Sequence, residues 1–141
     1  MSKELDERWR ALIKAGRAEW RPGMVAIACK DGAPYGDQFG GMQHRLGKEG
    51  ENQLMFLPED IAELEEGTLV YVPDWQDPAT LGALLGLVRE KWGIAHAFAA
   101  RDDYTGRWRV WSDGTTPIGK AGTTEAGALI AALGAACIPP K

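Results

Sequence analysis

The start of the chain carries apolar side chains at helical spacing. The positions that recur every three or four residues are Leu5, Trp9, Leu12 and Ile13. Such a stripe on an otherwise polar segment predicts an amphipathic helix over residues 2–20. Ser2 is a suitable N-terminal cap, and Arg21-Pro22-Gly23 supplies turn residues where the pattern stops.

Short apolar runs bounded by turn residues predict strands further along the chain. Residues 24–29, 52–57 and 68–74 have this pattern. Between the last two runs, residues 57–67 predict a short acidic helix, because Pro58 suits a first helical turn.

Residues 30–52 differ from the rest of the chain, because they are rich in glycine and have no sustained period. A stretch of this length without regular structure is uncommon in a compact domain, so we expect a flexible loop. Within it, residues 35–39 or 42–46 are candidates for one additional short strand.

A well-bounded helix is predicted over residues 78–92. Asp77 is a preferred cap, Pro78 suits the first helical position, and Gly93 suits the position after the end. The side chains on its bulky face are Leu81, Leu84, Leu85, Val88 and Trp92.

The opposite face of this helix carries Gly82 and Gly86. Each interior glycine costs roughly 1 kcal/mol relative to alanine, so we expect another helix to approach this face closely. The best candidate is the helix that carries Gly127 and Ala131, either in the same chain or across a homodimer. The alternative is that these small residues only reflect a composition rich in alanine and glycine.

The last third of the chain predicts a hairpin followed by a helix. Residues 95–114 have a hairpin pattern with residues 103–106 as the turn, and Thr123 is the expected cap of a helix through residues 126–136. With the preceding elements, this order predicts a single α+β domain, in which helices pack on a mostly antiparallel sheet.

Charge is distributed unevenly along the 141 residues, whose formal net charge is −4. Residues 49–79 contain nine Asp and Glu and no Lys or Arg. This balance disfavours direct nucleic-acid binding, which requires phosphate neutralisation, but it suits a basic partner. The expected partner-binding residues are Glu59, Asp60, Glu63, Glu65 and Glu66. The alternative is an ordinary solvated helix face.

The hairpin offers a second candidate surface. In a strand, Arg107, Arg109 and Trp111 share one face. Together with Arg101 from the neighbouring strand and Tyr104 from the turn, they are candidates for holding a phosphate or a stacked base. The alternative is a solvated sheet face with arginines lying over Trp111.

Signals for catalysis, cofactors and metals are scarce. Cys29 and Cys137 lie far apart without neighbouring ligands, and residues 40–49 lack the spacing and the hydroxyl of a phosphate-binding loop. We therefore expect no enzyme activity, cofactor or metal. The longest uncharged apolar run, residues 79–88, is about half of the ~20 residues that a membrane span requires, so no membrane span is expected. The two widely separated cysteines indicate reduced thiols, so we expect a cytoplasmic protein.

Two blocks of sequence resemble a known group of proteins. They are VPDWQDPATLGALLGLVREKWG at residues 72–93 and TTEAGALIAALGAA at residues 123–136. Both are similar to small, uncharacterised phage and prophage proteins with a VPDxxDPATLGxLLxLVRExWG block and a TEAxALxxAL helix. This resemblance implies a cytosolic protein of a virus or mobile element inside a bacterium, and it carries no activity over.

Two functional hypotheses follow from these observations. The first is a non-enzymatic phage or prophage protein that binds a host protein, one candidate being a defence component whose basic nucleic-acid surface the acidic segment occupies. The second is a protein that binds or sequesters a phosphate-bearing nucleotide through the hairpin residues.

Overall fold

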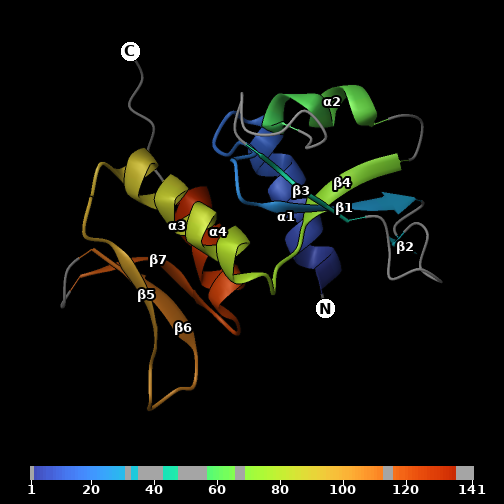
Figure 1. Cartoon of the computed structure of the whole chain (residues 1–141). Coiled ribbons are helices and arrows are strands. Elements are labelled where there is room, and N and C mark those ends of the chain that lie inside the picture. Colours follow the sequence, from blue (N-terminus) through green and yellow to red (C-terminus); the bar gives the residue numbers. More distant parts are fainter. Residues whose placement is uncertain are drawn as a thin grey trace. The chain divides into compact units, whose positions relative to one another are not determined.

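The computed structural model describes residues 2–30, 33–34, 43–47, 57–65, 69–112 and 116–135 (Figure 1). The chain divides into two compact units. One consists of Met1–Ala18 with Leu84–Lys141, and the other consists of Glu19–Ala83. Helices and two antiparallel sheets make up the fold, which confirms the predicted α+β class. That the whole chain folds as one domain stays a prediction.

The sheet of the Glu19–Ala83 unit is organised around β1 (Val25–Lys30). β4 (Leu69–Pro73) pairs antiparallel with β1 along most of its length. β2 (Ala33–Pro34) and β3 (Gln43–Arg45) pair with successive parts of β1, also antiparallel. The strands predicted from apolar runs at the positions of β1 and β4 are thereby confirmed.

β3 lies inside the glycine-rich stretch, in one of the two places where a short strand was expected. The alternative strand at residues 35–39 lies outside the described residues. Residues 52–56, which make up most of another predicted strand, also lie outside them. The flexibility expected for residues 30–52 stays a prediction. The short acidic helix is confirmed as a 3-10 turn, η2 (Pro58–Asp60), that continues into α2 (Ile61–Leu64).

In the other unit, α1 (Ser2–Lys14) is shorter than the predicted helix over residues 2–20. Gly16 has a φ of 74°, and the amide of Arg17 donates to the carbonyl of Leu12 at 2.9 Å. A left-handed glycine with this backward hydrogen bond ends a helix, because glycine adopts that conformation without steric cost. The helix therefore stops before the turn residues that the sequence pattern indicated.

The second sheet contains one strand more than the predicted hairpin. β5 (Phe98–Arg101), β6 (Trp108–Trp111) and β7 (Pro117–Gly122) pair antiparallel in this order. β7 was not predicted, because Ile118 is the only large apolar residue in it. α4 (Glu125–Ala135) packs against all three strands and also contacts α1, as Figure 1 shows.

α4 begins one residue later than predicted. The hydroxyl of Thr124 accepts the amide of Gly127 at 3.0 Å, so Thr124 and not Thr123 caps the helix. The bulky residues of α4 predicted to be apolar core are all buried: Leu129, Ile130 and Leu133.

Two glycines of β7 allow the strand to lie against the backbone of α4. A methyl group at Gly122 would lie 2.7 Å from the amide nitrogen of Ala128, and one at Gly119 would lie 2.9 Å from the Cα of Ala132. Real Cβ atoms do not approach other atoms so closely, because protein interiors are already packed to crystal density. The close approach in this unit is therefore between strand and helix.

The helix contact expected at Gly86 is wrong. Gly82 and Gly86 are exposed, and a methyl group on either would meet no described atom within 4 Å. Gly127 lies against β7 and not against a helix glycine. A methyl group added at Gly127 would lie 3.8 Å from the Cα of Gly122. A homodimer through these faces stays a prediction.

Asp77 caps α3 (Pro78–Trp92), as predicted, and also joins it to the neighbouring sheet. Its Oδ2 accepts both the amide and the hydroxyl of Thr80 at 2.9 Å. The Thr80 hydroxyl in turn accepts the amide of Val25 at 2.8 Å. Arg45 donates to both carboxylate oxygens of Asp77, at 2.9 and 3.2 Å.

This arrangement predicts a dependence of stability on acid. The Arg45 hydrogen bond, more than the opposing burial, lowers the pKa of Asp77 below its ordinary value, and the Thr80 hydrogen bonds act in the same direction. A carboxyl with a lowered folded-state pKa stabilises the fold above its unfolded pKa, and this contribution is lost as the pH falls through the folded value. Below about pH 4, urea midpoints should therefore fall more steeply for the parent than for Asp77→Asn, which keeps a capping oxygen but does not titrate. Equal slopes in both proteins would contradict this prediction.

Candidate ligand-binding site

The turn between β5 and β6 is fixed by its own hydrogen bonds. The Gly106 amide donates to the carbonyl of Asp102 at 2.7 Å, and the Asp102 amide donates to the carbonyl of Arg107 at 2.7 Å. The Asp102 carboxylate accepts the amide of Tyr104 at 2.8 Å. With Gly106 at a φ of 71°, these contacts confirm the predicted turn and hold the ends of both strands in place.

The register of the strands separates their side chains into two faces. Arg109 is paired with Ala100 and Trp111 with Phe98, so Arg109 and Trp111 share a face. Val110 points to the other face, where it is fully buried in the core. The predicted alternation of this strand is confirmed.

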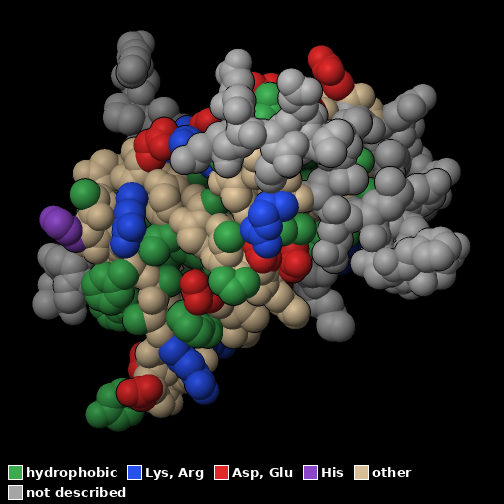
Figure 2. Space-filling view, in the orientation of Figure 1, with side chains coloured by type: hydrophobic (Ala, Val, Ile, Leu, Met, Phe, Trp, Pro, Cys, Tyr) green, Lys and Arg blue, Asp and Glu red, His purple; other side chains and the backbone are tan. Residues whose placement is uncertain are grey.

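The residues on the open face line a hollow of about 360 Å³. Its lining consists of Asp102, Thr105, Arg107, Arg109, Trp111 and Ala121. Figure 2 shows basic, acidic and hydrophobic side chains gathered along this end of the hairpin. We call this hollow the hairpin pocket.

The arginines of the hairpin pocket are available to a ligand. Arg109 and Trp111 are half-buried, and Arg107 is exposed. Within the part of the chain that the structure describes, no hydrogen bond or ion pair engages the guanidinium group of Arg107 or Arg109. The Thr105 hydroxyl accepts the backbone amide of Arg107 at 3.2 Å and so fixes the start of the strand.

Two residues expected in this site do not line it. Arg101 is paired with Trp108, which assigns it to the other face of the sheet, and Tyr104 is fully exposed in the turn. Three lining residues were missed: Asp102, Thr105 and Ala121. The turn residues were within reach of sequence reasoning, whereas Ala121 belongs to the unpredicted strand β7.

The acidic residues proposed for partner binding have different environments. The Asp60 carboxylate accepts the amide of Leu57 at 2.8 Å and thereby caps η2. The Glu65 carboxylate accepts the amide of Tyr71 at 2.9 Å. Burial, with a smaller effect of the Glu65 charge, raises the pKa of the Tyr71 hydroxyl. Two of the five acids therefore stabilise the local fold.

The other three acids divide between exposed and undescribed positions. Glu59 and Glu63 are exposed, and Glu66 lies outside the described residues. The spacing of four residues places Glu59 and Glu63 on neighbouring positions of one helical surface. The acidic surface that the structure describes is therefore smaller than the sequence suggested.

A metal site and a membrane span each require a particular arrangement of residues. Among those residues, no group of His, Cys, Asp and Glu side chains is arranged to hold a metal ion. None of the helices described is long and apolar enough to cross a membrane. No known family model, curated protein or solved structure matches the chain.

Proposed function

We propose that the protein binds a small aromatic phosphate, of the nucleoside monophosphate class, in the hairpin pocket. The observation that carries this proposal is that Arg107 and Arg109 line one hollow beside the indole of Trp111. Among the described residues, neither guanidinium group makes a hydrogen bond or an ion pair. The volume of about 360 Å³ falls within the range of small-molecule sites, roughly 300–1,000 Å³.

Each side chain has a distinct part in this proposal. Arginine presents a planar fork of donors that matches phosphate oxygens, and it does not lose its charge in proteins. The half-buried indole of Trp111 offers a surface on which a base can stack. Ala121 adds no bulk on the β7 side, which leaves room for the ring.

Asp102 limits the charge that the pocket accepts. Its carboxylate lies in the same lining as the two arginines, so the pocket carries a formal charge of about +1. A monophosphate matches that balance better than a triphosphate, which the carboxylate would repel. The second carboxylate oxygen is also suited to accept a hydroxyl or amine of the ligand.

The host-protein hypothesis takes second place. Among the described residues, only Glu59 and Glu63 of its five acids are exposed, because Asp60 and Glu65 are half-buried and accept backbone amides. Two exposed acids would contribute little to the free energy of binding a basic partner, because exposed ion pairs contribute about 0–1 kcal/mol each.

Calorimetric titration with adenosine 5′-monophosphate tests the proposal. We expect Arg107→Ala and Arg109→Ala each to weaken binding about tenfold, because charge-assisted hydrogen bonds contribute about 1.5–3 kcal/mol. Trp111→Leu should weaken the binding of the nucleotide but leave the affinity for inorganic phosphate unchanged. Arg101→Ala is the matched control, since it removes the same charge from outside the pocket.

The outcomes separate the two hypotheses. Absence of nucleotide binding at millimolar concentration, or an equal loss in Arg101→Ala, would overturn the pocket assignment. Nucleotide binding that is lost on reversing Glu59 and Glu63 to lysine, but kept in the arginine variants, would also contradict it.

A further inference from the structure

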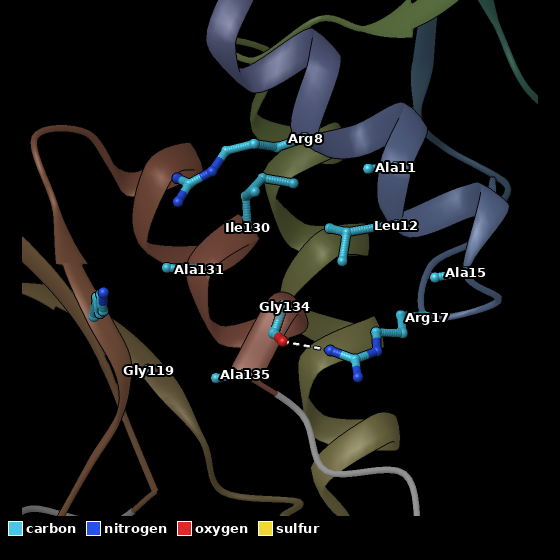
Figure 3. Close-up of a pocket in the computed structure, with 11 residues that line it drawn as sticks. Arg8, Ala11, Leu12, Ala15, Arg17, Gly119, Ile130, Ala131, Gly134 and Ala135 are labelled. Atoms are coloured by element: carbon cyan, nitrogen blue, oxygen red, sulfur yellow. Dashed lines mark hydrogen bonds between the residues drawn. The ribbon is translucent and has the colours of Figure 1, made fainter.

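A second hollow of about 590 Å³ lies between α1 and α4, within one compact unit. Figure 3 shows the two helices side by side, with small side chains along the space that they enclose. α1 contributes Ala11 and Leu12, Ala15 lines the hollow just after the end of α1, and α4 contributes Ala131 and Gly134 among others. We call this hollow the helix groove.

Several of the residues that line the helix groove have short side chains or none, which keeps it open. Ala11 lies on α1, and Ala15 follows the end of this helix with its amide donating to the carbonyl of Ala11 at 3.0 Å; both are exposed. A methyl group at Gly134 would already meet Leu12 Cδ2 at 4.0 Å, so even alanine there would narrow the space. Large residues at these positions would have filled the groove with the protein's own atoms.

The charges around the helix groove are all positive. Arg8, Arg17 and Lys120 line it, and no carboxylate is among its lining residues. Arg17 is engaged, because its Nη1 donates to the carbonyl of Gly134 at 2.6 Å. Arg8 and Lys120 are exposed, and within the described ranges no hydrogen bond or ion pair engages either side chain.

These two cations lie on the same side of the groove. Lys120 follows Gly119, the residue at which β7 lies against α4. A methyl group added at Gly119 would lie 3.0 Å from the carbonyl oxygen of Ala131. In Figure 3, the side chain of Arg8 extends from α1 toward the part of α4 that carries Ala131. An anionic group placed there would face two positive charges.

We propose that the helix groove binds an amphiphile with one carboxylate and an unbranched saturated chain, of the medium-chain fatty-acid class. The carboxylate would lie between Arg8 and Lys120, and the chain would extend past Ala11 and Leu12 toward Gly134. Along that path the lining side chains are aliphatic as far as Arg17, whose guanidinium group is held by the Gly134 carbonyl.

The chemistry of the lining disfavours a polar body for this ligand. A buried hydroxyl, amide or ring nitrogen would lose its hydrogen bonds to water without gaining a partner here. A saturated chain has no such groups, and burying its methylenes is favourable. This inference does not depend on the nucleotide proposal, because the two hollows share no lining residue.

Calorimetric titration with decanoate tests this inference on the full chain. We expect Arg8→Ala to weaken the binding of decanoate about fivefold, which corresponds to the free energy of a partly exposed ion pair. Lys14→Ala removes a positive charge from α1 outside the groove and should leave the affinity unchanged. Decan-1-ol, which has the chain without the charge, should bind more weakly than decanoate to the parent and equally to parent and Arg8→Ala.

A second variant tests occupancy of the groove itself. Ala11→Leu fills the space from an exposed helical position, so the fold is kept, and decanoate should bind more than about tenfold more weakly. Adenosine 5′-monophosphate binding should be unchanged in this variant. Equal decanoate affinity in parent and Ala11→Leu would overturn the inference, as would a parent dimer in sedimentation that Ala11→Leu converts to a monomer and decanoate leaves intact, which would assign the groove to a second copy of the chain.

Discussion

Gly119→Ala is expected to reduce the free energy of unfolding by about 3 kcal/mol or more. Two independent costs combine at this position. Gly119 has a φ of 71°, a left-handed conformation that costs an alanine roughly 1–2 kcal/mol. The added methyl group would also lie 2.9 Å from the Cα of Ala132, and backbone cannot move aside as a flexible side chain can.

Gly86→Ala is the matched control and should have the opposite sign. Its position is helical and exposed, with no described atom within 4 Å of the added methyl group. Replacing glycine by alanine in an exposed helix interior should stabilise the protein by about 0.5–1 kcal/mol. Urea denaturation of both variants measures the two effects. A Gly119→Ala protein as stable as the parent would contradict the close approach of β7 to α4.

Thr80→Val is expected to cost about 2 kcal/mol, within the range for leaving a buried donor without its acceptor. Thr80 has no exposed surface, and its hydroxyl is the acceptor for the Val25 amide. Valine has nearly the same shape, so packing is retained while this hydrogen bond and the one to Asp77 are lost. The loss should appear as a lower urea midpoint with an unchanged slope.

Thr80→Ser separates the hydroxyl from the methyl group. Serine keeps both hydrogen bonds and removes one buried methyl, so it should cost less than valine does, about 1 kcal/mol. If serine were the more damaging change, the methyl contact and not the hydrogen bond would hold α3 to β1.

Local rules located several features of this protein correctly. Asp77 followed by Pro78 marked the start of α3, because a side-chain acceptor satisfies the free amides of a first turn. Alternation along β6 placed Arg109 and Trp111 on one face, since neighbouring strand residues point in opposite directions. Half of the hairpin pocket could therefore be assigned from sequence.

Other features required contacts between distant residues. β7 pairs with β6 although its own sequence has little strand character, because pairing and the cover of α4 stabilise it. Ala121 enters the hairpin pocket through this strand. The helix groove depends likewise on α1 and α4, which the chain separates by most of its length.

The amino-acid sequence by itself determined the α+β class, the cap and extent of α3, and the arginine and tryptophan face of the hairpin. These features depend on residues within a few positions of one another. The tertiary structure alone decided which glycines permit a close approach: Gly119 and Gly122 against α4, and not Gly86. A glycine's spacing shows where bulk is missing, but only the partner that packs there determines whether the missing side chain matters.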